Sequence, residues 1–156
     1  MPAERQPSPG VEAPAPDGRF GVLVAGVPLL LPAVALEHVA AATVFPLPGA
    51  GEHVLGLAQL RGHPVVVLDA GPAEAQRRAP GHRPSLLVIG TPPEAGALVV
   101  DGAPRPVRVG GDCPEADRPQ SPFADALDGA VRDADDGTTL WWGFDPRRLF
   151  ELLAGR

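Results

Sequence analysis

The stretch VLGLAQLRGHPVVVLD, residues 54–69, contains two apolar segments separated by a short polar break. Val54–Leu60 and Pro64–Leu68 are each typical of a β-strand, because they are short and rich in aliphatic side chains. Arg61-Gly62 lies between them, and glycine accepts the positive φ angles that a tight turn requires. The run Val65–Leu68 shows no polar alternation, which predicts a strand covered on both faces. The stretch therefore predicts a β-hairpin.

Short apolar segments of the same kind precede this hairpin. Phe20–Ala25 and Val27–Leu31 are predicted to form two strands joined at Gly26, and residues 43–47 are also rich in β-forming side chains. Pro32 favours a first helical position, so we expect a short helical turn through residues 33–39, which contains Glu37 and Val39. Residues 1–18 are rich in Pro, Ala and charge, which predicts a disordered tail.

The second half of the chain repeats this pattern after a polar connection. Residues 70–84 are Pro-rich and polar, and we expect them to form an exposed link, whereas 110–122 should be a polar loop. Asp145 followed by Pro146 is typical of a helix N-terminus, and Gly155 of a helix end. Strands are predicted at Ser85–Ile89, Ala95–Val100, Pro104–Val109, Ala126–Ala134 and Thr138–Gly143.

About ten short strands in two similar groups, with little helix, predict an all-β protein. Two small barrels fit the pattern better than one sandwich, because barrels leave few unpaired strand edges. We expect one folded unit over residues 19–154. Its first barrel should lie mainly in 19–69 and its second mainly in 85–143, with the connection at 70–84 and the C-terminal helix at 145–154.

Composition excludes several classes of protein. A net charge of −6 and a pI near 5.1 argue against a nucleic-acid partner, which needs a basic surface. The apolar stretch at 22–35 is interrupted by Gly26, Pro28 and Pro32, so no membrane insertion is expected. Residues 1–18 do not resemble a signal peptide, and the single cysteine, Cys113, allows no internal disulfide. The expected location is therefore cytoplasmic.

The segment from Pro48 to Asp69 resembles the signature of the CheW family, in which a proline-led loop precedes a strand, a Leu-Arg-Gly turn and an apolar strand ending in aspartate. A second similarity lies at Gly96–Gly102, where the family has a glycine-led Val-Asp hairpin. The opening is similar as well, with Phe20 leading a hairpin. The matching residues of the main segment are Gly56, Leu57, Gln59, Leu60, Arg61, Gly62, Val65 to Leu68, and Asp69.

The resemblance implies two five-stranded SH3-like barrels around a shared core. It also implies a non-catalytic adaptor, without a cofactor, that couples chemoreceptors to a chemotaxis-type histidine kinase in signal transduction. Its partners would be the regulatory domain of the kinase and the cytoplasmic tip of methyl-accepting chemoreceptors. Gln59 replaces the usual Asn, and Ala70 follows Asp69 in place of a large aliphatic residue. These departures leave open a non-flagellar pathway, such as type IV pilus (twitching) control, with a different partner.

The candidate partner-binding residues cluster around this signature. Arg61 either contacts a partner directly or braces the fold through an ion pair with Glu37. Gly62 permits the tight turn between the two predicted strands of this hairpin. Val34, Leu36, Val39, Leu57 and Leu60 either line a groove for a receptor helix or belong to the core. Val54 and Leu55 follow a polar loop and are candidates for the surface. The candidate set comprises Glu37, Val39, Val54, Leu55, Leu57, Leu60, Arg61 and Gly62.

The sequence offers little to a catalytic interpretation. None of its three serines lies in a Gly-x-Ser-x-Gly motif, and it has no lysine for a phosphate loop or a Schiff base. The four histidines are scattered and Cys113 has no nearby cysteine, so no zinc site is expected. Asp133, Asp135 and Asp136 could suggest a calcium loop, but Thr138 occupies the position that requires glycine. We therefore expect no enzymatic activity and no metal.

Overall fold

The computed structural model describes residues 19–34, 36–72 and 81–155, and within these ranges it is almost entirely β. The tail expected over 1–18 and the middle of the connection expected over 70–84 lie outside them. The strands are β1 Phe20–Val24, β2 Val27–Leu30, β3 Leu36–Val39, β4 Val54–Leu60, β5 His63–Leu68, β6 Ser85–Ile89, β7 Gly96–Val100, β8 Arg105–Pro106, β9 Val109–Cys113, β10 Leu127–Asp133 and β11 Leu140–Phe144. A 3-10 turn, η1 (Ala124–Ala126), and one helix, α2 (Pro146–Ala154), complete the described fold, so the predicted fold class is confirmed.

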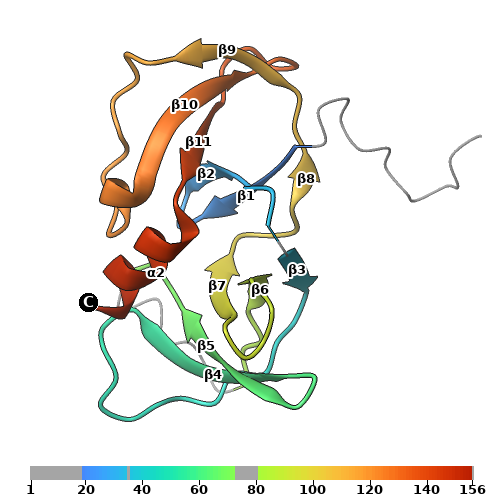
Figure 1. Ribbon diagram of the computed structural model, residues 1–156, viewed down its shortest axis with the longest axis vertical. Helices are drawn as coiled ribbons and strands as arrows, with labels where there is room; N and C mark the ends of the chain where they lie inside the picture. Colours follow the sequence, from blue (N-terminus) through green and yellow to red (C-terminus); the bar gives the residue numbers. More distant parts are fainter. Residues whose placement is uncertain (1–18, 35, 73–80, 156) are drawn as a thin grey trace, which may run out of the picture.

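The strands form two sheets that lie at opposite ends of the molecule (Figure 1). One has six strands in the order β8-β1-β2-β11-β10-β9, and the other has five in the order β3-β6-β7-β5-β4. β8 and β9 occupy opposite edges of the six-stranded sheet, yet only Val107 and Arg108 separate them in the chain, so this sheet must curl. In the other sheet, Phe45 follows β3 but bridges to Leu57 on β4, the opposite edge strand. Both sheets therefore curve toward closure.

The strand pairing does not follow the expected division into barrels over 19–69 and 85–143. β1 and β2 join the six-stranded sheet, where β2 lies parallel to β11 through the pair Leu29 and Trp142. β6 and β7, from the second half, pair with β3 and β5 from the first. The physical reason is that an apolar strand can complete its hydrogen bonds with any suitably placed partner. Spacing along the chain therefore does not fix which strands pair.

Three local expectations were wrong. Leu36–Val39 forms strand β3 instead of a helical turn, because its backbone pairs with β6 from Leu36↔Ile89 to Val39↔Leu86. The expected polar loop at 110–122 contains most of β9, which pairs with β10. Val66 is exposed although Val65 and Val67 are buried, so β5 is not covered on both faces at this residue.

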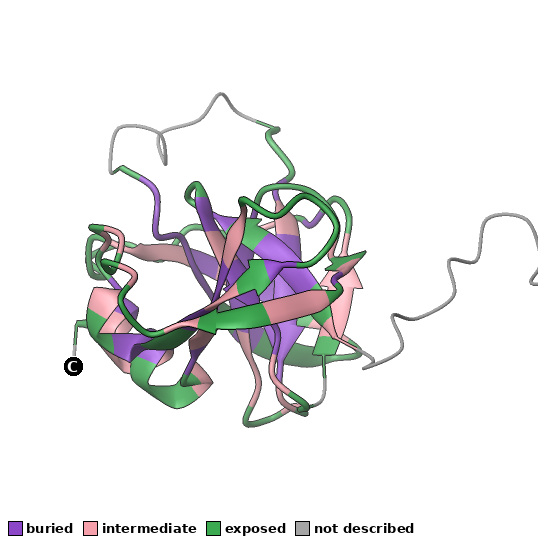
Figure 2. Cartoon of the chain, turned by 90° about the horizontal axis from the view of Figure 1, so that it is seen from above, coloured by how far each residue is buried: buried purple, intermediate pink, exposed green. Residues whose placement is uncertain are grey.

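One hydrophobic core joins the two sheets. It includes Leu29 from the six-stranded sheet, Leu98 from the five-stranded sheet, and Leu149 and Leu153 from α2, all 2% exposed or less. A smaller cluster around Val67 lies within the five-stranded sheet. Buried residues accordingly fill the middle of the molecule when it is seen from above (Figure 2). The core fixes the positions of both sheets, and hence of the surfaces between and around them.

The C-terminal helix begins and ends where the sequence predicts. The Asp145 side chain accepts hydrogen bonds from the backbone N–H groups of Arg147 and Arg148, and Pro146 occupies the first turn. Gly155 takes a left-handed conformation at the end. Helix α2 thereby closes over η1 and β5, next to the five-stranded sheet.

Candidate partner-binding surfaces

An apolar groove of about 510 Å³ lies where the two sheets meet, and we call it the inter-sheet groove. Its apolar lining comes from β1, from the chain after β2, from β3 and from Leu87 on β6. Phe20, Val34 and Leu36 stand out in this lining, because each exposes at least 36% of its surface. The full lining is Arg19, Phe20, Leu31, Pro32, Ala33, Val34, Leu36, Glu37, His38, Leu87 and Pro104.

The groove exists because the chain crosses from one sheet to the other at this point. The Leu31 N–H donates to the Phe20 carbonyl over 2.8 Å, which keeps the end of β2 against the start of β1. Five residues later, Leu36 begins β3 in the other sheet. His38, on β3, forms a 2.7 Å hydrogen bond with the Ser85 hydroxyl, and this contact fixes the ring at the groove's edge. Val34 and Leu36, near this crossing, therefore remain partly exposed to solvent.

The ion pair expected between Glu37 and Arg61 is confirmed. An Arg61 guanidinium nitrogen donates to Glu37 Oε1 over 3.1 Å. Glu37 lies on β3 and Arg61 in the β4–β5 turn, so the pair crosses the seam at which the two edges of the five-stranded sheet approach each other. Both side chains are exposed, at 74% for Arg61 and 42% for Glu37, and exposed pairs of this kind contribute about 1 kcal/mol or less. The pair therefore orients Arg61 more than it stabilises the fold.

The turn that carries Arg61 has an unusual backbone. Arg61 and Gly62 both have positive φ angles, 49° and 82°, between the paired residues Leu60 and His63. Two-residue hairpin turns of this type favour glycine because side chains resist positive φ. The prediction that Gly62 permits a tight turn is thus confirmed, and the turn presents the Arg61 side chain to solvent.

A second apolar surface follows the outer face of the five-stranded sheet. Phe45 bridges to Leu57, and Leu57 is paired with Val66, so the three side chains form one row across neighbouring strands. Phe45 is 57% exposed and Val66 42%. We call Phe45, Leu57 and Val66 the apolar row. Single exposed apolar residues are ordinary, but a contiguous row of them is typical of an interaction surface.

Four other candidate residues are partly buried and pack against the hydrophobic cores. Val39, Leu55 and Leu60 are half-buried and pack against the core of the five-stranded sheet, whereas Val54 packs against the shared core. None of these four lines the inter-sheet groove, and neither does Leu57.

Val34 and Leu36, two of the groove candidates, both line the groove. Phe20 and Pro104 also line it but are not among those candidates. No local signal marks these two as surface residues, because the groove forms only when the two sheets come together.

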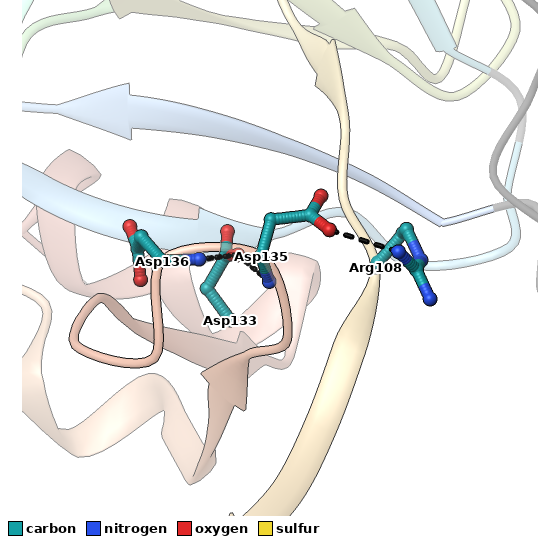
Figure 3. Close-up of polar contacts among 4 residues, drawn as sticks. All are labelled: Arg108, Asp133, Asp135 and Asp136. Carbon is teal, nitrogen blue, oxygen red and sulfur yellow. Dashed lines mark hydrogen bonds and ion pairs between the residues drawn. The ribbon is translucent and has the colours of Figure 1, made fainter.

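The acidic turn after β10 serves the fold. Asp133 is buried, and its carboxylate accepts hydrogen bonds from the Trp141 indole N–H (2.9 Å) and from the backbone N–H groups of Asp135 and Asp136. Figure 3 shows Asp133 inside its own turn, while Asp135 pairs outward with Arg108 over 3.0 Å. Asp133 thus accepts hydrogen bonds within its own turn, and Asp135 pairs with a side chain from the strand connection next to it. Among the described residues, no group of three or more His, Cys, Asp or Glu side chains could hold a metal ion.

The described part of the chain contains no helix that is long and apolar enough to cross a membrane. No protein-family model matches the sequence, and neither does any curated protein. A structural similarity does exist. The crystal structure of the scaffolding protein TtCheW from Thermoanaerobacter tengcongensis superposes with a TM-score of 0.59 at 19% sequence identity, covering 85% of this chain and 91% of that one. With its two sheets and short C-terminal helix, the chain described here has a CheW-like fold.

Proposed function

We propose that the protein is a non-catalytic adaptor that couples chemoreceptors to a chemotaxis-type histidine kinase. An adaptor of this kind must hold two partners at once, so it needs two separate receiving surfaces. The inter-sheet groove and the apolar row are two such surfaces, on different parts of a small fold. The CheW-like fold supports the same proposal, since the similar protein is described as a scaffolding protein.

The inter-sheet groove is the observation that carries the proposal. Partner helices bind in grooves by inserting apolar side chains spaced three or four residues apart. Phe20, Val34 and Leu36 offer exposed apolar contacts for such a helix, and Glu37 and His38 offer polar contacts at the edge. We assign this groove to the cytoplasmic tip of a methyl-accepting chemoreceptor.

We assign the apolar row to the regulatory domain of the kinase. Its residues lie on the outer face of a curved sheet, where a partner with a similar small barrel could pack its own sheet face. Arg61 and Gly62 end the same hairpin that carries Leu57 and Val66. In this assignment the Glu37–Arg61 pair holds Arg61 beside the kinase contact, so Arg61 both braces the seam and borders the interface.

The same surfaces suit a second candidate, a CheW-like scaffold in a non-flagellar pathway such as type IV pilus control. Gln59, which stands where the CheW family has Asn, is exposed on β4 close to the apolar row. Because Gln59 lies beside the proposed kinase contact, its difference from the usual Asn is compatible with binding to a different kinase. Binding to the kinases of each pathway in turn separates the two candidates.

Three substitutions test the assignments by calorimetry with purified receptor fragments and kinase regulatory domains. We expect Leu36→Glu to weaken receptor binding at least tenfold, because a carboxylate would be buried against apolar side chains. Leu47→Glu is the control, since Leu47 is similarly exposed, at 39% against 36%, but lies outside the groove. Phe45→Glu should instead weaken kinase binding and leave receptor binding intact.

Equal receptor affinities for Leu36→Glu and the wild-type protein would show that the groove is not the receptor site. If the wild-type protein binds no receptor fragment and no kinase domain, the adaptor function itself is wrong.

A further inference from the structure

A second groove adjoins the inter-sheet groove. Its volume is about 820 Å³, and it lies between α2 and the turn that joins β6 to β7. Val34 lines both grooves and is 48% exposed, so the two meet at this side chain. We call it the helix-side groove; it is lined by Val34, Ile89, Gly90, Glu94, Pro146, Arg147, Phe150, Glu151 and Ala154.

The floor of the helix-side groove is held in place by the fold. Phe150 is half-buried, and its ring lies on β7 at Gly96, where a β-carbon would come within 3.1 Å of the ring. Leu149 and Leu153, on the buried face of α2, anchor the helix in the shared core. Ile89 is itself a core residue at the end of β6. The groove is therefore a built surface with a rigid apolar floor.

The charged groups along its rim lie on two separate elements. On α2, Glu151 lies 3.5 Å from the Arg147 guanidinium and 3.7 Å from that of Arg148, so its charge is compensated. Glu94, in the β6–β7 turn, makes no ion pair with any residue that the structure describes. An uncompensated carboxylate beside an apolar floor favours a partner with a basic side chain next to its apolar face.

We propose that one partner occupies both grooves. The helical receptor segment that enters the inter-sheet groove continues across Val34, and it places a lysine or arginine against Glu94. This inference rests on the proposed receptor function and adds its second contact region. The shared Val34 supplies the continuity, and Glu94 supplies the charge complementarity. The expected partner is therefore a helix with an apolar face and a basic residue beside that face.

The test compares two charge reversals in the 156-residue chain. Glu94→Arg removes the complementary charge and introduces a repulsive one, so affinity for the receptor fragment should fall about three- to tenfold at low salt. The loss should shrink as salt is raised, because rim charges are screened. Glu115→Arg makes the same change in net charge on an exposed loop after β9, away from both grooves, and should leave the affinity unchanged. Circular dichroism checks that both variants are folded.

The outcomes separate this inference from the function on which it rests. If Glu94→Arg binds like the wild-type protein while Leu36→Glu does not bind, the second contact region is wrong and the receptor function stands. If Glu94→Arg and Glu115→Arg weaken binding equally, the effect is one of net charge, and the specific contact is again wrong. If wild-type protein does not bind receptor fragments, both proposals are wrong together.

Discussion

Two aspartates of the turn after β10 tie stability to pH. The pKa of Asp136 is lowered from 3.8 to about 2, chiefly by the hydrogen bond from the Thr139 hydroxyl and then by the backbone N–H groups of Thr138 and Thr139. The pKa of Asp133 is also lowered, first by the Trp141 indole N–H, although burial opposes this shift. Both carboxylates thus favour the charged form in the folded protein more than in the unfolded chain.

The sign of the pH dependence follows from these shifts. Between about pH 4 and pH 2 the unfolded chain binds more protons than the folded one, so the free energy of unfolding decreases as the pH falls through this range. We predict that Asp136→Asn flattens this decrease, because the substituted side chain no longer titrates. Urea denaturation at a series of pH values measures it. An unchanged slope in the variant would show that Asp136 does not couple folding to protons.

Much at the residue scale could be predicted, because it depends on neighbours in the chain. Arg61-Gly62 defined its turn, and Asp145 with Pro146 defined the start of α2. The Glu37–Arg61 pair came from the family resemblance and not from spacing. The burial of Asp133 against Trp141 could not be foreseen, because nothing local distinguishes an aspartate that accepts an indole N–H from one that faces water.

At the scale of the elements, the seam of the five-stranded sheet depends on one glycine. Gly56 on β4 is buried, and a β-carbon there would lie 2.1 Å from the Phe45 carbonyl oxygen. Backbone cannot move aside as a side chain can, so Gly56→Ala should separate Phe45 from β4 and cost about 2–3 kcal/mol of unfolding free energy. Thermal and urea denaturation measure the loss.

Gly129→Ala is the matched control for this prediction. Gly129 also lies in a strand, β10, but a β-carbon there would meet no atom within 4 Å. Its substitution should change the unfolding free energy by no more than about 0.5 kcal/mol. If both variants were equally stable, the close approach of Phe45 to β4 would not be a constraint on the fold.

Strand β3 shows why some elements escape prediction. Pro32 favours a helical turn on local grounds, and the four residues of β3 are too few to show a strand period. They become a strand because β6, almost fifty residues later, offers an edge with a matching register from Leu36↔Ile89 to Val39↔Leu86. The same pairing brings Leu36 and Glu37 into the inter-sheet groove, so the sequence can suggest Leu36 as a groove residue but cannot show which strand carries it there.

For the whole molecule, the interleaved strands make the two sheets depend on each other. β1 and β2 leave the first half of the chain to join strands of the second, and β6 and β7 do the reverse. The shared core then contains Leu29 and Leu98 from different sheets, together with Leu149 from α2. Neither sheet can keep this core if the other unfolds. We therefore expect the two sheets to unfold in one cooperative transition.

Leu98→Ala tests this cooperativity from the sheet that holds no tryptophan. Leu98 is fully buried on β7, and truncation should cost about 3 kcal/mol of unfolding free energy. Trp141 and Trp142 both lie on β11. Trp142 also packs in the shared core, but Trp141 packs with Leu30 and Val107, so their fluorescence reports chiefly the six-stranded sheet. Far-ultraviolet circular dichroism reports both sheets. In a cooperative molecule the substitution lowers the urea midpoint of the two signals by the same amount. A fluorescence midpoint that stayed at its wild-type value while the dichroism midpoint dropped would mean that the sheets unfold independently. In that case the loss of one sheet would remove its side of the inter-sheet groove while the other sheet stayed folded.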